Sequence, residues 1–203
     1  MVPWLAGAAF HEDQIELLRD LGVKDSKVLS PTKRVRLAEE IKKLALSWHY
    51  VALPANEVDP YVFSRQRLFK LNYLEAKLMA EVIAALIPDE VYVDASDVNE
   101  ERFADQIAQH LTSRIPITSK HHADATYPVV SAASILAKVQ RDSAIVDLRQ
   151  EYGDFGSGYP SDPKTEEFLI TWRREHGCYP DFARQSWKTL KRLEESINQL
   201  KLG

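Results

Sequence analysis

Short apolar segments alternate with helical segments along most of this chain, and this alternation constrains the fold more than any other feature. The clearest strand, residues 91–93, is of a buried type and follows the strongest helical pattern, residues 68–86. Strands that alternate with helices indicate a sheet with helices packed on it. We therefore expect an α/β domain over residues 1–155, followed by a C-terminal helical region over residues 156–203.

Capping residues and helix breakers set the expected ends of the elements. Proline follows both Ser30 and Asp162, and a polar N-cap followed by proline is typical of a helix start. Gly22 is a typical helix stop. The predicted strands are residues 4–10, 50–53, 91–93 and 115–118, and the predicted helices, N-caps included, are residues 13–21, 30–46, 68–86, 99–111, 127–152, 162–175 and 184–200.

The composition excludes several classes of protein. No apolar run approaches the roughly 18 residues that a membrane-spanning helix requires, and the first residues lack the basic region of a signal peptide. Cys178 is the only cysteine, which excludes an internal disulfide and fits a reducing compartment. We expect a cytoplasmic monomer without a membrane partner.

The charge of the chain is negative overall and positive in places. The net charge of −4 argues against nucleic-acid binding through bulk electrostatics. Local clusters of basic residues occur at residues 33–36, 65–70, 120–122 (Lys-His-His), 173–174 and 184–192. Most such clusters are solvated faces, so they permit an anionic partner without requiring one.

Asp94 and Asp124 are the candidate catalytic carboxylates. Asp94 ends a strand, and ligand sites in open α/β sheets gather at the carboxyl ends of strands. It could equally cap the turn that follows. Asp124 lies at the entrance of a predicted helix, where a carboxylate is usually a cap. The spacing alone leaves both interpretations open.

The helix that follows Asp124 has small residues at most positions of residues 131–138. Small residues permit close packing of a helix on a sheet, which is sufficient to explain them. Close packing would also bring Asp124 beside Asp94, and the pair could then hold a divalent cation with Lys138 as a nearby charge partner. Asp97 favours a structural role, because residues 97–99 resemble the turn at a helix start.

Two further motifs are weaker signals. His121 and His122 could bind zinc, but no cysteine or third histidine lies at a suitable spacing, so a phosphate contact or plain solvation is favoured. Residues 156–160 (GSGYP) are not a P-loop, because no Gly-Lys-Ser/Thr follows. Glycines around a tyrosine suit a stiff loop that presents the Tyr159 hydroxyl to a sugar or its 2′-hydroxyl.

Longer motifs occur in a fixed order along the chain. They are GVKDSK with Leu29 (residues 22–29), YVDASDV (92–98), HHADATY (121–127), VSAASILAK (130–138), Arg141-Asp142, YGDFGSGYPSDP (152–163), and Arg184, Trp187 and Lys188. In this order they resemble the ribonuclease HII family, especially its archaeal branch. The resemblance covers nearly the whole chain, and its motifs are highly specific.

The resemblance implies a fold and a reaction. The fold is α/β, a ribonuclease H-like mixed sheet of five strands flanked by helices, with a C-terminal helical region. The reaction is endonucleolytic cleavage of the RNA strand of RNA–DNA hybrids and at ribonucleotides embedded in duplex DNA. Two Mg²⁺ or Mn²⁺ ions, held by four carboxylates, serve as cofactors. The partner is therefore an RNA–DNA hybrid or ribonucleotide-containing duplex DNA, and a sliding clamp is a further candidate.

The resemblance also assigns residues. It makes Asp94 a catalytic, metal-binding carboxylate and Asp124 the last of the four. Tyr159 matches the tyrosine that senses the ribose 2′-hydroxyl at the RNA–DNA junction. The residues expected to contact backbone phosphates are Lys24, Ser26, Lys27 and Lys138. Residues 1–155 would form the catalytic domain and residues 156–203 the substrate-binding region.

One family motif has no counterpart in this sequence. The family opens with a strand that ends in Asp-Glu-Ala-Gly-Arg-Gly, supplies two of the four carboxylates and lies in the middle of the sheet. Here residues 1–9 resemble the stretch after that motif, and the acidic pairs at residues 12–13 and 89–90 have the wrong neighbours. We expect a ribonuclease HII shortened at its start, with unpaired strand backbone in its core and little cleavage activity.

Two other functions stay open at this point. One is a non-catalytic protein that binds RNA–DNA hybrid through Tyr159, Lys138 and the basic residues 184–192. The other is an unrelated α/β phosphotransferase with an aspartate at a strand end, which lacks any accompanying motif.

Overall fold

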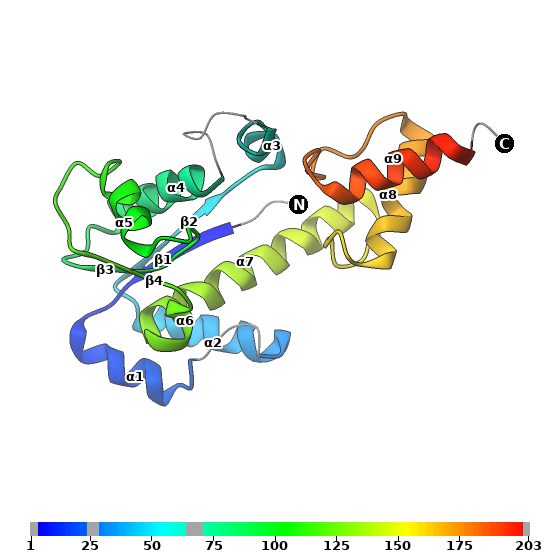
Figure 1. Ribbon diagram of the computed structural model, residues 1–203. Coiled ribbons are helices and arrows are strands. Elements are labelled where there is room, and N and C mark those ends of the chain that lie inside the picture. The colour runs from blue at the N-terminus through cyan, green and yellow to red at the C-terminus, as the bar shows by residue number, and fades with distance from the viewer. Residues whose placement is uncertain (1–3, 24–28, 64–70, 201–203) are drawn as a thin grey trace. The chain divides into compact units, whose positions relative to one another are not determined.

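The computed structural model describes residues 4–23, 29–63 and 71–200, and of residues 196–200 the backbone alone (Figure 1). The predicted phosphate contacts Lys24, Ser26 and Lys27 lie outside the described residues. The chain divides into two compact units. The sheet unit comprises residues 4–52 and 70–141, and the helical unit comprises residues 1–3, 53–69 and 142–203.

The sheet unit contains two pairs of strands. Strand β1 (Trp4–Ala9) pairs antiparallel with β2 (Ser47–Ala52), and β3 (Val91–Asp94) pairs parallel with β4 (Ile117–Lys120). All four lie at or near the predicted strands. The helices of this unit are η1 (Glu12–Gln14, a 3₁₀ turn), α1 (Ile15–Asp20), α2 (Pro31–Leu44), α4 (Leu71–Leu86), α5 (Glu100–Ala108), α6 (Ala123–Thr126) and the first part of α7 (Pro128–Tyr152).

Side-chain caps start several of these helices, as predicted. The Ser30 hydroxyl accepts a hydrogen bond from the backbone N–H of Lys33 at 3.3 Å, with Pro31 as the first residue of α2. Asn99 accepts from the backbone N–H of Arg102 at 2.8 Å at the start of α5. These caps satisfy N–H groups that the first turn of a helix leaves without partners.

Helices cover both faces of the strands (Figure 1). Ala6 and Ala8 of β1 pack against the apolar cluster formed by α2 and α7. Gly7 faces α4 so closely that an added Cβ would overlap Val82 and lie 2.8 Å from Leu86 Cδ1. Gly7 faces α4 while Ala6 and Ala8 face the other side, because alternate residues of a strand point to opposite faces. The overlap with Val82 favours glycine at this position.

The second strand pair has α4 and α5 on one face and the start of α7 on the other. Val91 and Val93 pack in a cluster with α4 and α5. The ring of Tyr92 lies on the other face, 4.7 Å from that of Tyr127 at the start of α7. Both strand pairs therefore share one layer, with α4 on one side of it.

The strands do not form a single sheet in the described part of the chain. There β1 pairs only with β2, and β3 only with β4, so the mixed architecture is present as one antiparallel and one parallel pair. The resemblance places a family strand between these two pairs, and no strand in the described residues joins them. Every residue of β1 is half-buried, which is unusual for a strand with helices on both faces.

The helical unit contains α3 (Ala55–Phe63), α8 (Pro163–His176), α9 (Lys188–Leu200) and the end of α7. Aromatic rings fill its core, and Phe155 stacks on Phe182 with ring centroids 4.7 Å apart. None of the helices that the structure describes is long and apolar enough to cross a bilayer. The functional division at residue 155 stays a prediction.

Two elements of this unit differ from the predictions. The prediction missed α3, which includes Pro60, a residue usually excluded from helix interiors. Helix α9 begins at Lys188 instead of residue 184. The buried carboxylate of Asp59 accepts the backbone N–H groups of Gln185 at 2.7 Å and Ser186 at 3.0 Å, and these bonds turn the chain before the helix starts.

The contact between Asp59 and the start of α9 predicts a stability effect. Asp59→Ala leaves two partly buried N–H groups without acceptors, so we expect a loss of about 1–3 kcal/mol of unfolding free energy. Asp59→Asn keeps one acceptor oxygen and should lose less. Urea unfolding followed by circular dichroism measures both, and an alanine variant as stable as wild type would contradict the role of this carboxylate.

Candidate active site

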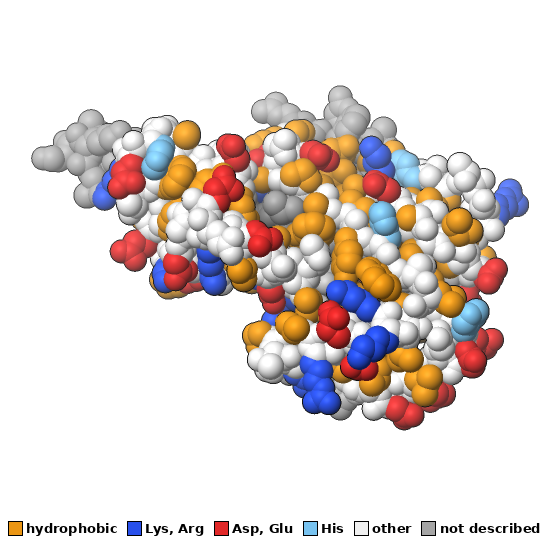
Figure 2. All heavy atoms as spheres, turned by 180° about the vertical axis from the view of Figure 1, so that it is seen from behind, with side chains coloured by type: hydrophobic (Ala, Val, Ile, Leu, Met, Phe, Trp, Pro, Cys, Tyr) orange, Lys and Arg blue, Asp and Glu red, His pale blue; other side chains and the backbone are white. Residues whose placement is uncertain are grey.

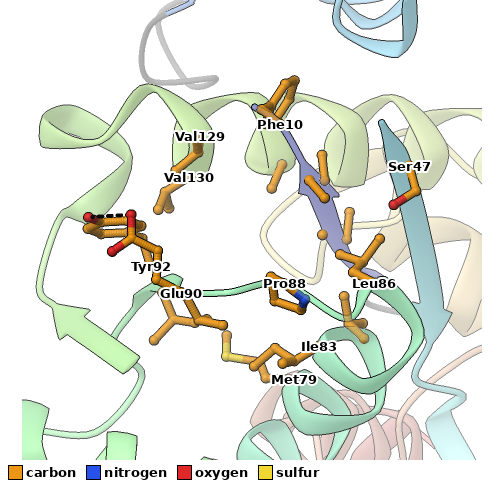
Figure 3. Close-up of a pocket in the computed structure, with 18 of the residues that line it drawn as sticks. Phe10, Ser47, Met79, Ile83, Leu86, Pro88, Glu90, Tyr92, Val129 and Val130 are labelled. Atoms are coloured by element: carbon orange, nitrogen blue, oxygen red, sulfur yellow. Dashed lines mark hydrogen bonds between the residues drawn. The ribbon is translucent and has the colours of Figure 1, made fainter. Parts of the chain in front are cut away.

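A cavity of about 860 Å³ lies within the sheet unit, lined by β1 and β3 (Figure 3). We call it the inter-strand groove. In Figure 3, Met79, Ile83 and Leu86 of α4 line one side of it, and Val129 and Val130 of α7 line another. Its remaining lining includes Gly7, Asp94, Asp124, Ala133 and Ala137.

Asp94 lies at the carboxyl end of β3, in the position that the sequence predicts. Its half-buried carboxylate accepts a hydrogen bond from the backbone N–H of Ala123 at 3.2 Å. This bond ties the end of β3 to the first residue of α6. Asp94 also lines the inter-strand groove, so its side chain has access to a ligand there.

Asp124 follows Ala123 directly and lines the same groove. The residue is only 7% exposed, and in the part of the chain that the structure describes no side chain or N–H donates to its carboxylate. His122, in the left-handed conformation at φ 55°, turns the chain into α6 and so places Asp124. The structure thus brings the two predicted carboxylates to one cavity.

These two carboxylates fit one divalent cation better than two. No group of three or more His, Cys, Asp or Glu side chains that could hold a metal occurs among residues 4–23, 29–63 and 71–195. Mg²⁺ commonly takes one or two protein carboxylates and keeps several waters. Two cations about 4 Å apart need more negative charge than one pair of aspartates provides.

Glu100 and Lys120, two charged residues near the end of the β3–β4 pair, are engaged in structural contacts. Glu100 accepts the backbone N–H of His121 at 2.7 Å and forms an ion pair with Lys120 at 2.9 Å. These two hydrogen bonds lower the pKa of Glu100. They connect the end of β4 to α5, a role that no sequence motif indicates.

Asp97 has the structural role that the sequence predicts. Its carboxylate accepts the backbone N–H of Asn99 at 2.9 Å, the Asn72 amide at 3.3 Å, and the guanidinium of Arg102, with which it forms an ion pair. Burial opposes its ionisation, but the hydrogen bonds from Arg102, Asn99 and Asn72 outweigh that effect and lower its pKa. Asp97 therefore shapes the turn after Asp94 and does not line the groove.

Tyr159 belongs to the helical unit, where a braced loop presents it with 45% of its surface exposed. The buried hydroxyl of Thr165 accepts the N–H of Gly158 at 3.0 Å and donates to the carbonyl of Phe155 at 2.9 Å. Asp162 accepts the N–H of Ser157 at 2.6 Å. These bonds connect residues 155–158, which precede the tyrosine, to the start of α8.

Lys138 is half-buried on α7, next to the groove-lining Ala137, and does not itself line the groove. On the face of the described residues that Figure 2 shows, Lys and Arg side chains are interspersed with Asp and Glu. This mixture agrees with the net charge of −4 and leaves no broad basic surface on that face.

The order of these features along the chain agrees with a known family. The model of the family described as ribonuclease HII matches residues 4–190. The chain belongs to the ribonuclease HII family. The family, the ribonuclease H-like α/β fold and the enzyme class predicted from the sequence are all confirmed.

Individual relatives support the same assignment. Ribonuclease HII of Methanosarcina barkeri is 43% identical over 204 residues, which cover 96% of this chain and 89% of the relative. The crystal structure of ribonuclease H2 from Pyrococcus horikoshii has a TM-score of 0.84 and 35% identity, and the match covers 98% of this chain and 99% of that one. A ribonuclease HII from Archaeoglobus fulgidus, solved in complex with PCNA, has a TM-score of 0.82 and 38% identity over 95% of this chain and 89% of that chain.

Ribonuclease HII is a hydrolase, an endonuclease that acts on RNA–DNA hybrids, and the family depends on divalent metal ions.

Sequence reasoning missed the structural roles of two residues, one in each unit. Thr165 looks like an ordinary residue in the first turn of a helix, and Glu100 looks like a solvated helix-start carboxylate. Their roles depend on tertiary contacts, for which the sequence carries no signal.

The braced loop predicts a dependence of stability on pH. Hydrogen bonds from Ser157, first from its hydroxyl and then from its N–H, lower the pKa of Asp162 from 3.8 to about 2. A lowered pKa in the folded state stabilises the protein above pH 3.8, and this contribution is lost as the pH falls from there through about 2. We expect Asp162→Asn to destabilise the protein at pH 6 and to differ less from wild type at pH 3.

Urea unfolding of both proteins at the two pH values measures this difference. Asp105→Asn, at an exposed position of α5, is the matched control and should leave the unfolding free energy unchanged at both. A destabilisation by Asp162→Asn that is equally large at pH 3 and pH 6 would contradict the assignment.

Proposed function

We propose that Asp94 and Asp124 hold one Mg²⁺ or Mn²⁺ ion at the carboxyl end of β3 and that this centre cleaves the RNA strand at ribonucleotides. The observation that carries the proposal is their convergence on the inter-strand groove, with the Ala123 N–H bonded to Asp94 at 3.2 Å. The family dependence on divalent metal ions supports it.

The environment of Asp124 gives a physical reason for a cation. An ionised carboxylate that is buried without a donor is costly unless a charge or a metal ion compensates it. Asp124 is 7% exposed and receives no hydrogen bond from the described residues. A bound divalent cation would supply that charge and would activate water near a phosphodiester. The Ala123 N–H would keep Asp94 oriented toward the same ion.

Substrate selection is proposed to come from other residues. The hydroxyl of Tyr159 would contact the ribose 2′-hydroxyl, and residues 156–203 would form the substrate-binding region. Lys138, with Lys24, Ser26 and Lys27, would contact backbone phosphates of an RNA–DNA hybrid or of duplex DNA with an embedded ribonucleotide. We propose a sliding clamp as a protein partner, because the relative from Archaeoglobus fulgidus was solved in complex with PCNA.

We propose that this chain cleaves the RNA strand only weakly. Two carboxylates neutralise one cation, and the second cation expected for the family would be left without ligands in the described part of the chain. The same observation favours a second candidate function, a non-catalytic protein that binds RNA–DNA hybrid. The two functions differ in whether metal binding and residual cleavage depend on Asp94.

Substitution of the two aspartates tests the metal centre. We expect Asp94→Asn and Asp124→Asn each to weaken Mn²⁺ binding at least about tenfold, or about 1.4 kcal/mol, because each removes a charged ligand. Paramagnetic resonance of Mn²⁺ measures binding, and a duplex with one ribonucleotide measures cleavage in Mg²⁺ and Mn²⁺. Asp105→Asn on α5 is the matched control.

Each outcome of that experiment distinguishes between the catalytic metal centre and the non-catalytic function. Weak wild-type cleavage that both asparagine variants abolish supports the proposal. Robust wild-type cleavage would overturn the weak-activity claim, and Mn²⁺ binding unchanged by either variant would overturn the metal centre. Hybrid binding without Mn²⁺ binding or cleavage would establish the non-catalytic function instead.

The role of Tyr159 is tested by binding alone. Tyr159→Phe removes the hydroxyl and keeps the ring, so we expect a loss of about 0.5–1.5 kcal/mol for duplexes with one ribonucleotide. Affinity for the all-deoxy duplex should not change. Fluorescence anisotropy at one salt concentration measures both affinities. An equal loss on both duplexes would show that the hydroxyl does not read the 2′-hydroxyl.

A further inference from the structure

The chain passes from β4 to Asp124 through residues 120–123, which we call the 120–123 turn. His122 adopts the left-handed conformation there, with φ at 55°, which is uncommon for a residue other than glycine. A backbone conformation of this kind persists only where surrounding contacts hold it. The contacts of the 120–123 turn therefore determine where the Asp124 carboxylate lies.

Glu100, the first residue of α5, makes two of these contacts. One oxygen of its carboxylate accepts the backbone N–H of His121 at 2.7 Å, and the other accepts the ammonium group of Lys120 at 2.9 Å. A hydrogen bond to an ionised acceptor is roughly twice as strong as one between neutral groups. Glu100 thus holds the two residues that precede His122.

Two longer contacts hold the rest of the 120–123 turn. The carboxylate of Asp94 accepts the N–H of Ala123 at 3.2 Å, and Nε2 of His121 lies 3.4 Å from the carbonyl oxygen of Val98. Both distances exceed the 2.7 Å between Glu100 and the N–H of His121. Hydrogen bonds weaken as they lengthen, so the contact with Glu100 is the strongest one that ties this turn to a side chain in the described residues.

We propose that Glu100 is a positioning residue, whose carboxylate holds the 120–123 turn in the conformation that brings Asp124 to Asp94 at the inter-strand groove. Glu100 itself does not line the groove, so it acts through the turn and not as a metal ligand. The effect on metal binding rests on the proposed cation centre, whereas the effect on the conformation of the turn does not.

Three variants of the full chain test this role. Glu100→Ala removes both contacts with the 120–123 turn. Glu100→Gln removes the charge but keeps an oxygen that can accept the N–H of His121. Glu101→Ala is the matched control, because Glu101 is also an acidic residue in the first turn of α5 and makes no hydrogen bond to residues 120–123 among the described residues.

Hydrogen exchange of the Ala123 amide, followed by NMR without metal ions, reports on the turn directly. We expect Glu100→Ala to speed this exchange at least about tenfold, because the bond from Ala123 to Asp94 then opens more often. Glu100→Gln should restore most of the protection, and Glu101→Ala should leave it unchanged. Amides in the middle of α4 provide the internal reference and should exchange equally in all variants.

Paramagnetic resonance of Mn²⁺ measures the consequence for the metal centre. Groups that orient a metal ligand commonly contribute about tenfold or more to metal affinity, so we expect Glu100→Ala to weaken Mn²⁺ binding about tenfold. Glu100→Gln and Glu101→Ala should bind Mn²⁺ nearly as well as wild type. A role of Glu100 in overall stability alone would leave the Mn²⁺ affinity of the folded protein unchanged.

Three outcomes would overturn the proposal. The first is unchanged exchange of the Ala123 amide in Glu100→Ala. The second is an equal loss of Mn²⁺ affinity in Glu100→Ala and Glu100→Gln, which would mean that the charge acts on the cation directly. The third is Mn²⁺ affinity that Glu100→Ala does not change although Asp94→Asn and Asp124→Asn weaken it.

Failure of the proposed cation centre gives a different result. Mn²⁺ binding that neither Asp94→Asn nor Asp124→Asn weakens would overturn that centre. The exchange of the Ala123 amide is measured without metal ions, so it would still decide whether Glu100 holds the 120–123 turn.

Discussion

The rest of the sheet unit depends on the way its strand backbone is hydrogen-bonded, which among the described residues is along one edge of each strand. Strands β1 and β3 each use one edge, and α4 spans both of them through Val82, Leu86 and Ile83. The contact at Gly7 brings β1 close to α4, so β1 and β3 lie in one layer although no backbone bond joins them. The inter-strand groove and the positions of Asp94 and Asp124 in its lining depend on this arrangement.

Local signals were sufficient to predict most of the fold. Ser30 and Asn99 are N-caps whose hydrogen bonds form as their sequence context indicates. Where prediction was wrong, a tertiary contact had determined the outcome. Helix α9 starts late because Asp59, distant in sequence, binds the N–H groups of residues 185 and 186. Helix α3 includes Pro60, which favours a break when the sequence is considered alone.

The functional residues also divide into those whose roles a local sequence pattern indicates and those whose roles come from tertiary contacts. The turn pattern of residues 97–99 predicts the structural role of Asp97, whereas the strand before Asp94 leaves open whether that carboxylate binds a ligand or caps the turn. The role of Thr165 could not be predicted, because its importance comes from two hydrogen bonds to a loop whose conformation the sequence does not specify. The roles of Asp94, Asp124, Tyr159 and Lys138 in catalysis and binding stay predictions that the experiments above address.

The open edge of β1 also bears on how long the chain survives in a cell. Exposed strand edges are templates for aggregation, and most proteins protect them with charges, prolines or bulges. Trp4–Ala9 has none of these charges or prolines, so its recessed position between α4 and α7 provides the protection. Any fluctuation that moves either helix away would expose an uncharged edge, and chaperones and proteases would then compete with self-association for this chain.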